Sequence, residues 1–207
     1  MEKVNKIFLE YELRSELLCI GERTKKGTFK PCVKTIPYSS ITYALRNTLE
    51  RDDIHAAGML DEKYLSDIDK HRGIHVYSPR HRYEDVAKVP LNIEYLIDVV
   101  GRVYVLFENK IDPKASLEIN MGAFRSKGFG RCSLVFKGEV EAPAVKRGIL
   151  FTRIPEKHFD AFGITRVEKP VYGYLFEPKD ILSGRYVKSV FEGSIVMGYD
   201  FLLKKER

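Results

Sequence analysis

Apolar and charged residues alternate over residues 7–14, IFLEYELR, a pattern typical of a β-strand with one buried and one exposed face. Residues 91–107 are rich in Ile, Val, Tyr and Phe, and we expect Gly101 to split them into two strands. A further strand is predicted over residues 132–140, CSLVFKGEV. These four predicted strands would form a sheet with an apolar face.

Two stretches show signals of helices instead. In residues 39–51, SSITYALRNTLER, apolar side chains recur at helical spacing, and Ser39 or Ser40 can cap the first turn. A second helix is predicted over residues 112–124, DPKASLEINMGAF, because Asp112 is a good cap and proline suits the first helical position. Both helices would then lie between predicted strands.

The resulting order is strand, helix, strand, strand, helix, strand, which is the split βαβ or ferredoxin-like arrangement also found in RNA-recognition motifs. We therefore predict an α+β fold. Residues 1–144 would form the ferredoxin-like domain, with an irregular insertion at about 52–90. Residues 145–207 are rich in short aromatic strands and form either a second half or an extension of the same domain.

Composition adds a preference for anionic partners. The chain has 207 residues, a net charge of +6 and a pI of about 9.1, a moderate basic excess that favours nucleic acid. No apolar run is long enough to span a membrane. Three cysteines, Cys19, Cys32 and Cys132, lack metal-site spacing and are expected to be free thiols in a cytoplasmic protein.

A glycine-rich loop precedes the last predicted ferredoxin strand. Residues 121–131, MGAFRSKGFGR, combine three glycines with three cations and no acid. Glycines permit positive φ, so backbone N–H groups of such a loop can approach a phosphate, and the cations can hold it. Phe129 either packs inward or stacks on a base. A Walker A loop is excluded because Phe129 follows Gly128, and a Rossmann loop is excluded by the order of elements and the glycine spacing, while a simple turn with solvated cations remains an alternative.

This loop and the stretch IPYSSITYALR at residues 36–46 together resemble two motifs of the RAMP superfamily, the repeat-associated proteins of CRISPR systems. The family usually has glycine between the proline and the serine pair, where this chain has Tyr38. The resemblance is greatest to backbone subunits of type III effector complexes. It implies that the chain binds CRISPR RNA and acts in antiviral defence. The RNA-binding residues that it implies are Ser39, Ser40, Arg46, Gly122, Arg125, Lys127, Gly128, Phe129, Gly130 and Arg131. Its implied partners are CRISPR RNA and other effector subunits.

Some members of this superfamily cut RNA, by one of two routes. Guide-processing enzymes use a histidine as acid or base without a metal, and here His55, His75 and His81 are the weak candidates. Target-cleaving subunits use an aspartate before the first helix, but between Leu17 and Leu49 the only acid is Glu22. We therefore expect a non-catalytic subunit that needs no metal or cofactor. Two alternatives stay open: a processing endoribonuclease, and a ferredoxin-like interaction module that does not bind RNA.

Overall fold

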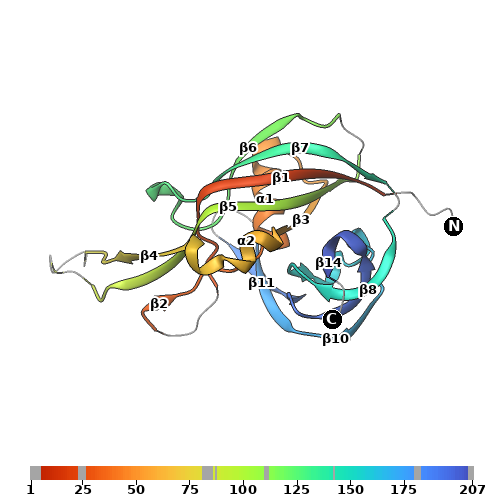
Figure 1. Cartoon of the computed structure of the whole chain (residues 1–207). Coiled ribbons are helices and arrows are strands. Elements are labelled where there is room, and N and C mark those ends of the chain that lie inside the picture. The colour runs from red at the N-terminus through yellow and green to blue at the C-terminus, as the bar shows by residue number, and fades with distance from the viewer. Residues whose placement is uncertain are drawn as a thin grey trace.

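The computed structural model describes residues 6–22, 27–80, 86, 88–109, 112–141, 143–179 and 183–204. Strand β5 (Leu91–Phe107) organises the main sheet, because four other strands pair along its 17 residues. Strand β1 (Ile7–Leu18) pairs with it antiparallel on one side. On the other side β3 (Ile54–Leu60) pairs with its second half and β4 (Arg72–Tyr77) with its first half. The short strand β2 (Phe29–Lys30) joins it in parallel (Figure 1).

The sheet continues beyond β1 with two more strands. Strand β7 (Arg131–Glu141) pairs antiparallel with β1, and β6 (Ser116–Asn120) pairs antiparallel with β7 at the edge. The spatial order β3–β5–β1–β7, with one helix between β1 and β3 in the chain, is that of a ferredoxin-like sheet. The predicted α+β, ferredoxin-like class is therefore confirmed.

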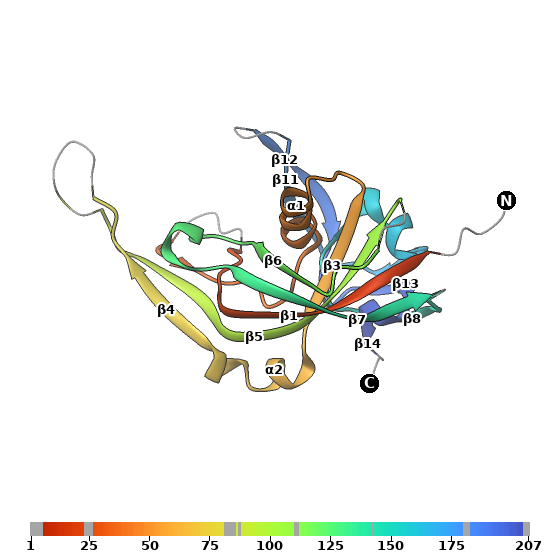
Figure 2. The ribbon, with the colours of Figure 1, turned by 90° about the horizontal axis from the view of Figure 1, so that it is seen from above.

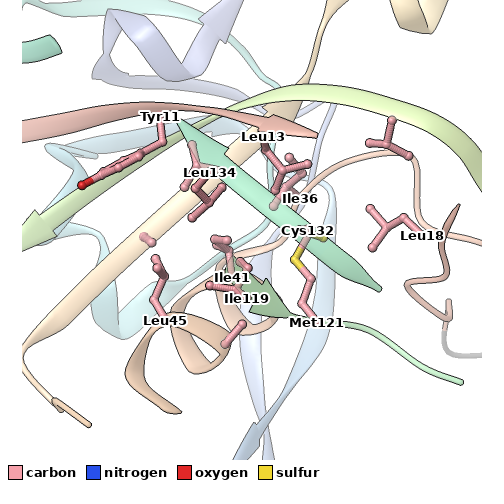
Figure 3. Close-up of a cluster of buried hydrophobic side chains, with 14 of the residues drawn as sticks. Tyr11, Leu13, Leu18, Ile36, Ile41, Leu45, Ile119, Met121, Cys132 and Leu134 are labelled. Carbon is pink, nitrogen blue, oxygen red and sulfur yellow. The ribbon is translucent and has the colours of Figure 1, made fainter. Parts of the chain in front are cut away.

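Helix α1 (Tyr38–Leu49) covers one face of this sheet. Ile41, Ala44 and Leu45 recur on its buried side, as the sequence pattern predicts. They meet alternate side chains of the strands, such as Leu13 and Leu134, in one apolar core (Figure 3). The helix begins at Tyr38 with Pro37 at the N-cap position, so Ser39 and Ser40 lie in the first turn and neither caps it.

The strands after residue 144 form two smaller sheets. One contains β8 (Val145–Leu150), β10 (Arg166–Lys169), β13 (Ile195–Tyr199) and β14 (Leu203–Lys204). The other contains β9 (Ile154–Pro155), β11 (Tyr172–Pro178) and β12 (Gly184–Val190). Single turns of 3-10 helix interrupt this part as η3 (Glu156–His158), η4 (Asp160–Phe162) and η5 (Asp200–Leu202).

A second apolar core joins these sheets to the main one. Phe8 of β1 and Tyr104 of β5 pack on residues of the C-terminal part, in a cluster that also contains Tyr38 of α1. The ring of Phe8 lies 6.0 Å from that of Phe162, and the ring of Tyr104 lies 4.2 Å from that of Phe201. The two parts of the chain therefore share a core. The predicted boundary between residues 144 and 145 stays a prediction.

Three expectations about elements are wrong. Residues 52–90 are not an irregular insertion, since they contain β3, helix α2 (Glu62–Ser66), the turn η1 (Ile68–His71) and β4. Strand β5 is continuous, and Gly101 is needed because a Cβ there would lie 2.5 Å from the Met59 carbonyl of the neighbouring strand. Residues 116–120 form β6 in place of a second helix, because Leu117 and Ile119 alternate with exposed residues and fit the edge of β7.

No helix among the described residues is long and apolar enough to cross a membrane.

The shared core predicts that both parts unfold together. We expect Phe8→Ala to lower the free energy of unfolding by about 3–5 kcal/mol, because it leaves a cavity between the two parts. Urea unfolding followed by circular dichroism and by tyrosine fluorescence should give one coincident transition. Val135→Ala on the exposed face of β7 is the control, with a change within about 0.5 kcal/mol. Two separate transitions in the wild-type chain would contradict this prediction.

Candidate nucleic-acid interface

The glycine-rich loop is held against the end of β1. The N–H of Ala123 donates to the Cys19 carbonyl and the N–H of Gly130 donates to the Leu17 carbonyl, each over 2.7 Å. Gly122 and Gly130 have φ of 86° and 81°, and a Cβ on either would collide with a backbone carbonyl. Gly122 therefore allows the close contact of the loop with the end of β1, and Gly130 allows the close approach of the two ends of the loop. The Gly130 N–H is therefore bonded inside the protein and is not one of the loop donors that can reach a phosphate.

Phe129 packs inward and anchors the loop against β5. Its exposed fraction is 9%, and its ring lies 5.1 Å from the ring of Tyr95 of β5. His75 of β4 and Phe124 also border this cluster, with ring distances to Phe129 of 6.1 Å and 6.4 Å. Phe129 is therefore a core residue, and the alternative of base stacking by this ring is not supported.

The cations of the loop point outward. The turn η2 (Arg125–Lys127) forms its tip, and both end residues are exposed with no ion-pair partner among the described residues. Arg131, at the start of β7, instead pairs with Glu118 at 3.3 Å across the strand edge. Arg125 and Lys127 are thus the cations of this loop that remain available to an anion.

The start of α1, the glycine-rich loop and the β11–β12 hairpin line one open groove of about 810 Å³. In Figure 2 the hairpin rises beside α1, and β6 passes on the other side of the helix. Ser39, Ser40, Gly122 and Arg125, four of the residues singled out from the sequence, lie along this groove. The Ser39 and Ser40 hydroxyls at the helix start, close to the exposed Arg125 guanidinium, suit an anionic group such as phosphate.

Tyr38 does not obstruct this groove, although it occupies the position where the resembling family has glycine. Its side chain is 1% exposed and turns into the second core, where its hydroxyl lies 2.8 Å from Nδ1 of His55. Burial raises the pKa of this phenol. The tyrosine therefore fixes the first turn of α1 from inside the protein.

The side chain of Arg46 holds two secondary-structure elements together. Its Nε and Nη2 both donate to the Ile54 carbonyl, over 3.0 Å and 2.9 Å, which joins the last turn of α1 to the start of β3. It is not among the residues that line the groove. The geometry therefore gives Arg46 a different task from the RNA contact that the resemblance implies.

Arg153 is a buried residue of the groove that no sequence pattern singles out. Its guanidinium donates two hydrogen bonds to Glu22 and two to Glu192, over 2.6–3.0 Å. These carboxylates hold the pKa of the guanidinium above its ordinary value, against the opposing effect of burial. Because Glu22 is engaged in this pair, the only acid between Leu17 and Leu49 has a structural role.

The candidate histidines do not form one site. His55 lies on β3, between the Tyr38 hydroxyl and Glu108, and His75 borders the Phe129 cluster on β4. His81 lies outside the described residues. His158, which the sequence did not single out, stacks on Tyr38 at 4.5 Å and lies 5.1 Å from the ring of His55. None of the described histidines lines the groove. Among the residues that the structure describes, no cluster of three or more metal-ligating side chains occurs.

Comparison with known proteins identifies a shared fold. No protein-family model and no curated protein sequence matches the chain. A chain in the cryo-EM structure of the type III-B Cmr-beta complex bound to cognate target RNA superposes with a TM-score of 0.51 and 11% identity, covering 91% of this chain and 86% of that chain. A structure of the same complex with target RNA and AMPPnP gives a TM-score of 0.49 and 12% identity, covering 92% and 86%. The first likeness shows that the chain shares the fold of a component of that complex.

Two glycines of the loop allow a matched test of its packing. Gly128 and Gly130 both have positive φ, but a Cβ on Gly128 meets open space whereas one on Gly130 would lie 2.0 Å from the Met121 carbonyl. We expect Gly128→Ala to cost about 1–2 kcal/mol from backbone strain. Gly130→Ala should cost about 1–3 kcal/mol more from the collision. Urea unfolding of both variants measures the difference, and equal losses would contradict the close approach.

The buried histidine pair predicts a pH dependence of stability. Burial, together with the charge of Lys157, lowers the pKa of His158 from 6.5 to about 4. The unfolded chain therefore binds this proton first, so stability falls as the pH decreases from about 6.5 towards 4. Between pH 7 and pH 4.5 we expect the wild type to lose about 2 kcal/mol more than His158→Gln, which cannot titrate. Identical pH dependence of unfolding in the two proteins would contradict this assignment.

Proposed function

We propose that this chain is an RNA-binding, non-catalytic subunit of a class 1, type III-like CRISPR ribonucleoprotein, acting in antiviral defence. The observation on which this rests is the groove, in which the start of α1 and the tip of the glycine-rich loop face the same space. Both elements belong to the two sequence motifs that resemble the RAMP superfamily. Two segments that are far apart in the chain thus meet where an anionic strand would be bound.

The charges around the groove support an anionic ligand. Among the described residues that line it, the one carboxylate is Glu22, which pairs with Arg153; this guanidinium also pairs with Glu192, which does not line the groove. Arg125 adds a cation that no acid compensates within the described structure, and Lys127 lies two residues further along the same exposed turn. A phosphate backbone running past these residues would release counterions, so binding would weaken with added salt.

The fold supports the same proposal at a coarser level. The structure that it resembles is a component of a type III-B complex bound to target RNA. Chains of one fold can have different functions, so the groove and the two motifs remain the argument for RNA and for sister subunits as partners.

The alternative of a guide-processing endoribonuclease has less support. Metal-independent cleavage needs an acid and a base that reach the ribose hydroxyl and the leaving oxygen. His55 and His158 are close to each other, but both are largely buried and neither borders the groove. The interaction-module alternative instead predicts no salt-dependent affinity for RNA.

The Arg125→Ala/Lys127→Ala variant tests the proposal. We expect the wild type to bind a CRISPR repeat-containing RNA and an unrelated single strand, with an affinity that falls steeply between about 50 and 200 mM salt, as phosphate contacts require. If each cation contacts one phosphate, the double variant should lower the slope of log K against log salt by about 1.4. Fluorescence anisotropy gives the affinities, and a gel in EDTA reports cleavage.

The matched control is Lys63→Ala/Lys70→Ala, which removes the same charge from the α2–η1 segment, away from the groove. It should leave the salt slope unchanged. Equal effects of the two double variants would place the RNA elsewhere on the surface. Site-specific cleavage in EDTA would favour the processing enzyme, and absence of binding by the wild type would favour the interaction module.

A further inference from the structure

The β11–β12 hairpin has an exposed face made of aromatic rings. Tyr172, Tyr174 and Phe176 alternate along β11, and Tyr186 lies opposite Phe176 on β12. Their exposed fractions are 51%, 56%, 47% and 52%. Four rings that are each half exposed on one small sheet are unusual, because large apolar side chains normally seek the core. These four residues are called the aromatic face below.

The rings of the aromatic face are held in place by the hairpin. Leu175 and Ser189 point to the opposite side, where they are buried, so the register of the two strands is fixed. Phe176 and Tyr186 meet edge to face with ring centroids 5.5 Å apart. A Cβ on Gly184 would lie 2.3 Å from the Phe176 ring, so the ring rests directly on the glycine. Rings fixed in this way lose little entropy when a ligand binds.

The aromatic face continues the groove. Tyr174, Phe176 and Tyr186 line the same space as Ser39 and Arg125. At the other end of the face, the ammonium of Lys188 lies 4.0 Å above the ring of Tyr172. A ligand along this surface would therefore meet flat rings on one side and phosphate-binding groups on the other.

We propose that the aromatic face stacks on unpaired bases of an RNA strand whose phosphates lie at Arg125 and the start of α1. Alternate residues of a strand are about 6.6–6.8 Å apart, roughly twice the 3.4 Å spacing of stacked bases, so one base fits between the rings of Tyr174 and Phe176. Every base has a π-face, so this contact is tolerant of sequence and requires single-stranded RNA. This inference rests on the proposed function. It adds that the aromatic face contacts the bases of the RNA, whereas the start of α1 and Arg125 contact its phosphates.

The absence of tryptophan from the sequence provides a site-specific probe. Tyr174→Trp introduces a single indole into the aromatic face. We expect its fluorescence to be quenched by a single-stranded oligoribonucleotide and unaffected by an abasic ribose-phosphate strand of the same length. A fully paired RNA duplex should also leave it unchanged, because its bases are already stacked. Equal quenching by the abasic strand would overturn the proposal.

Affinity measurements separate stacking from phosphate binding. Tyr174→Ala should weaken binding of the single-stranded RNA about 5- to 150-fold, and Tyr174→Phe should retain the affinity because it keeps the ring. The abasic strand should bind the wild type and Tyr174→Ala equally. Arg125→Ala should weaken both strands, since it acts on the phosphates. This contrast distinguishes failure of the aromatic face from failure of the groove.

Phe29→Ala is the matched control, because Phe29 is 46% exposed but lies on β2 outside the aromatic face. It should bind RNA as the wild type does. An unchanged affinity of Tyr174→Ala, the result expected if the face contacts a protein subunit instead, would overturn base stacking and leave the groove in place. Failure of the wild type to bind either strand would overturn both proposals.

Discussion

A single buried cation, Arg153, connects the start of α1, the segment after β1 and the segment after the β11–β12 hairpin. The backbone carbonyl of Arg153 accepts the N–H of Tyr38 at the start of α1, over 3.0 Å. Its guanidinium holds Glu22, just after β1, and Glu192, just after β12, and stacks on Phe191 at 4.1 Å. A buried guanidinium must be paired, because an unpaired charge in the interior is strongly destabilising. The position of the helix start relative to the hairpin is therefore fixed by one satisfied charge network.

The glycine-rich loop is attached to the same framework by backbone contact. Cys19, whose carbonyl receives the loop, lies three residues before Glu22, so the Arg153 network and the loop share the end of β1. Close approach of two backbones at Gly122 leaves the tip of the loop, with Arg125, above the start of α1. Glycine in this loop thus acts through packing, and the side chains at the tip supply the charge.

Elements whose pattern is set by neighbouring residues in the chain were predicted correctly from the sequence. Elements that form only by pairing with a distant strand were not. The alternation in β1 and the apolar stripe of α1 are local, because each residue's environment follows from its neighbours in the chain. Residues 116–120 show a helix-start signal before them, yet they form β6, because the open edge of β7 pairs with them. The same holds for β4, whose alternating residues become a strand only against the first half of β5.

The site shows the same division. The motifs around Ser39 and Arg125 were recognisable in the sequence, whereas the inward position of Phe129 depends on Tyr95, which comes from another strand. The aromatic face had a local signal, since Tyr172, Tyr174 and Phe176 alternate, but alternation alone does not tell which side of a strand is buried. Burial of Leu175 and Ser189 on the other face of the hairpin decides it. Side chains that face a ligand and side chains that face the core obey the same periodicity, so only the packing of the opposite side distinguishes a binding surface from a core.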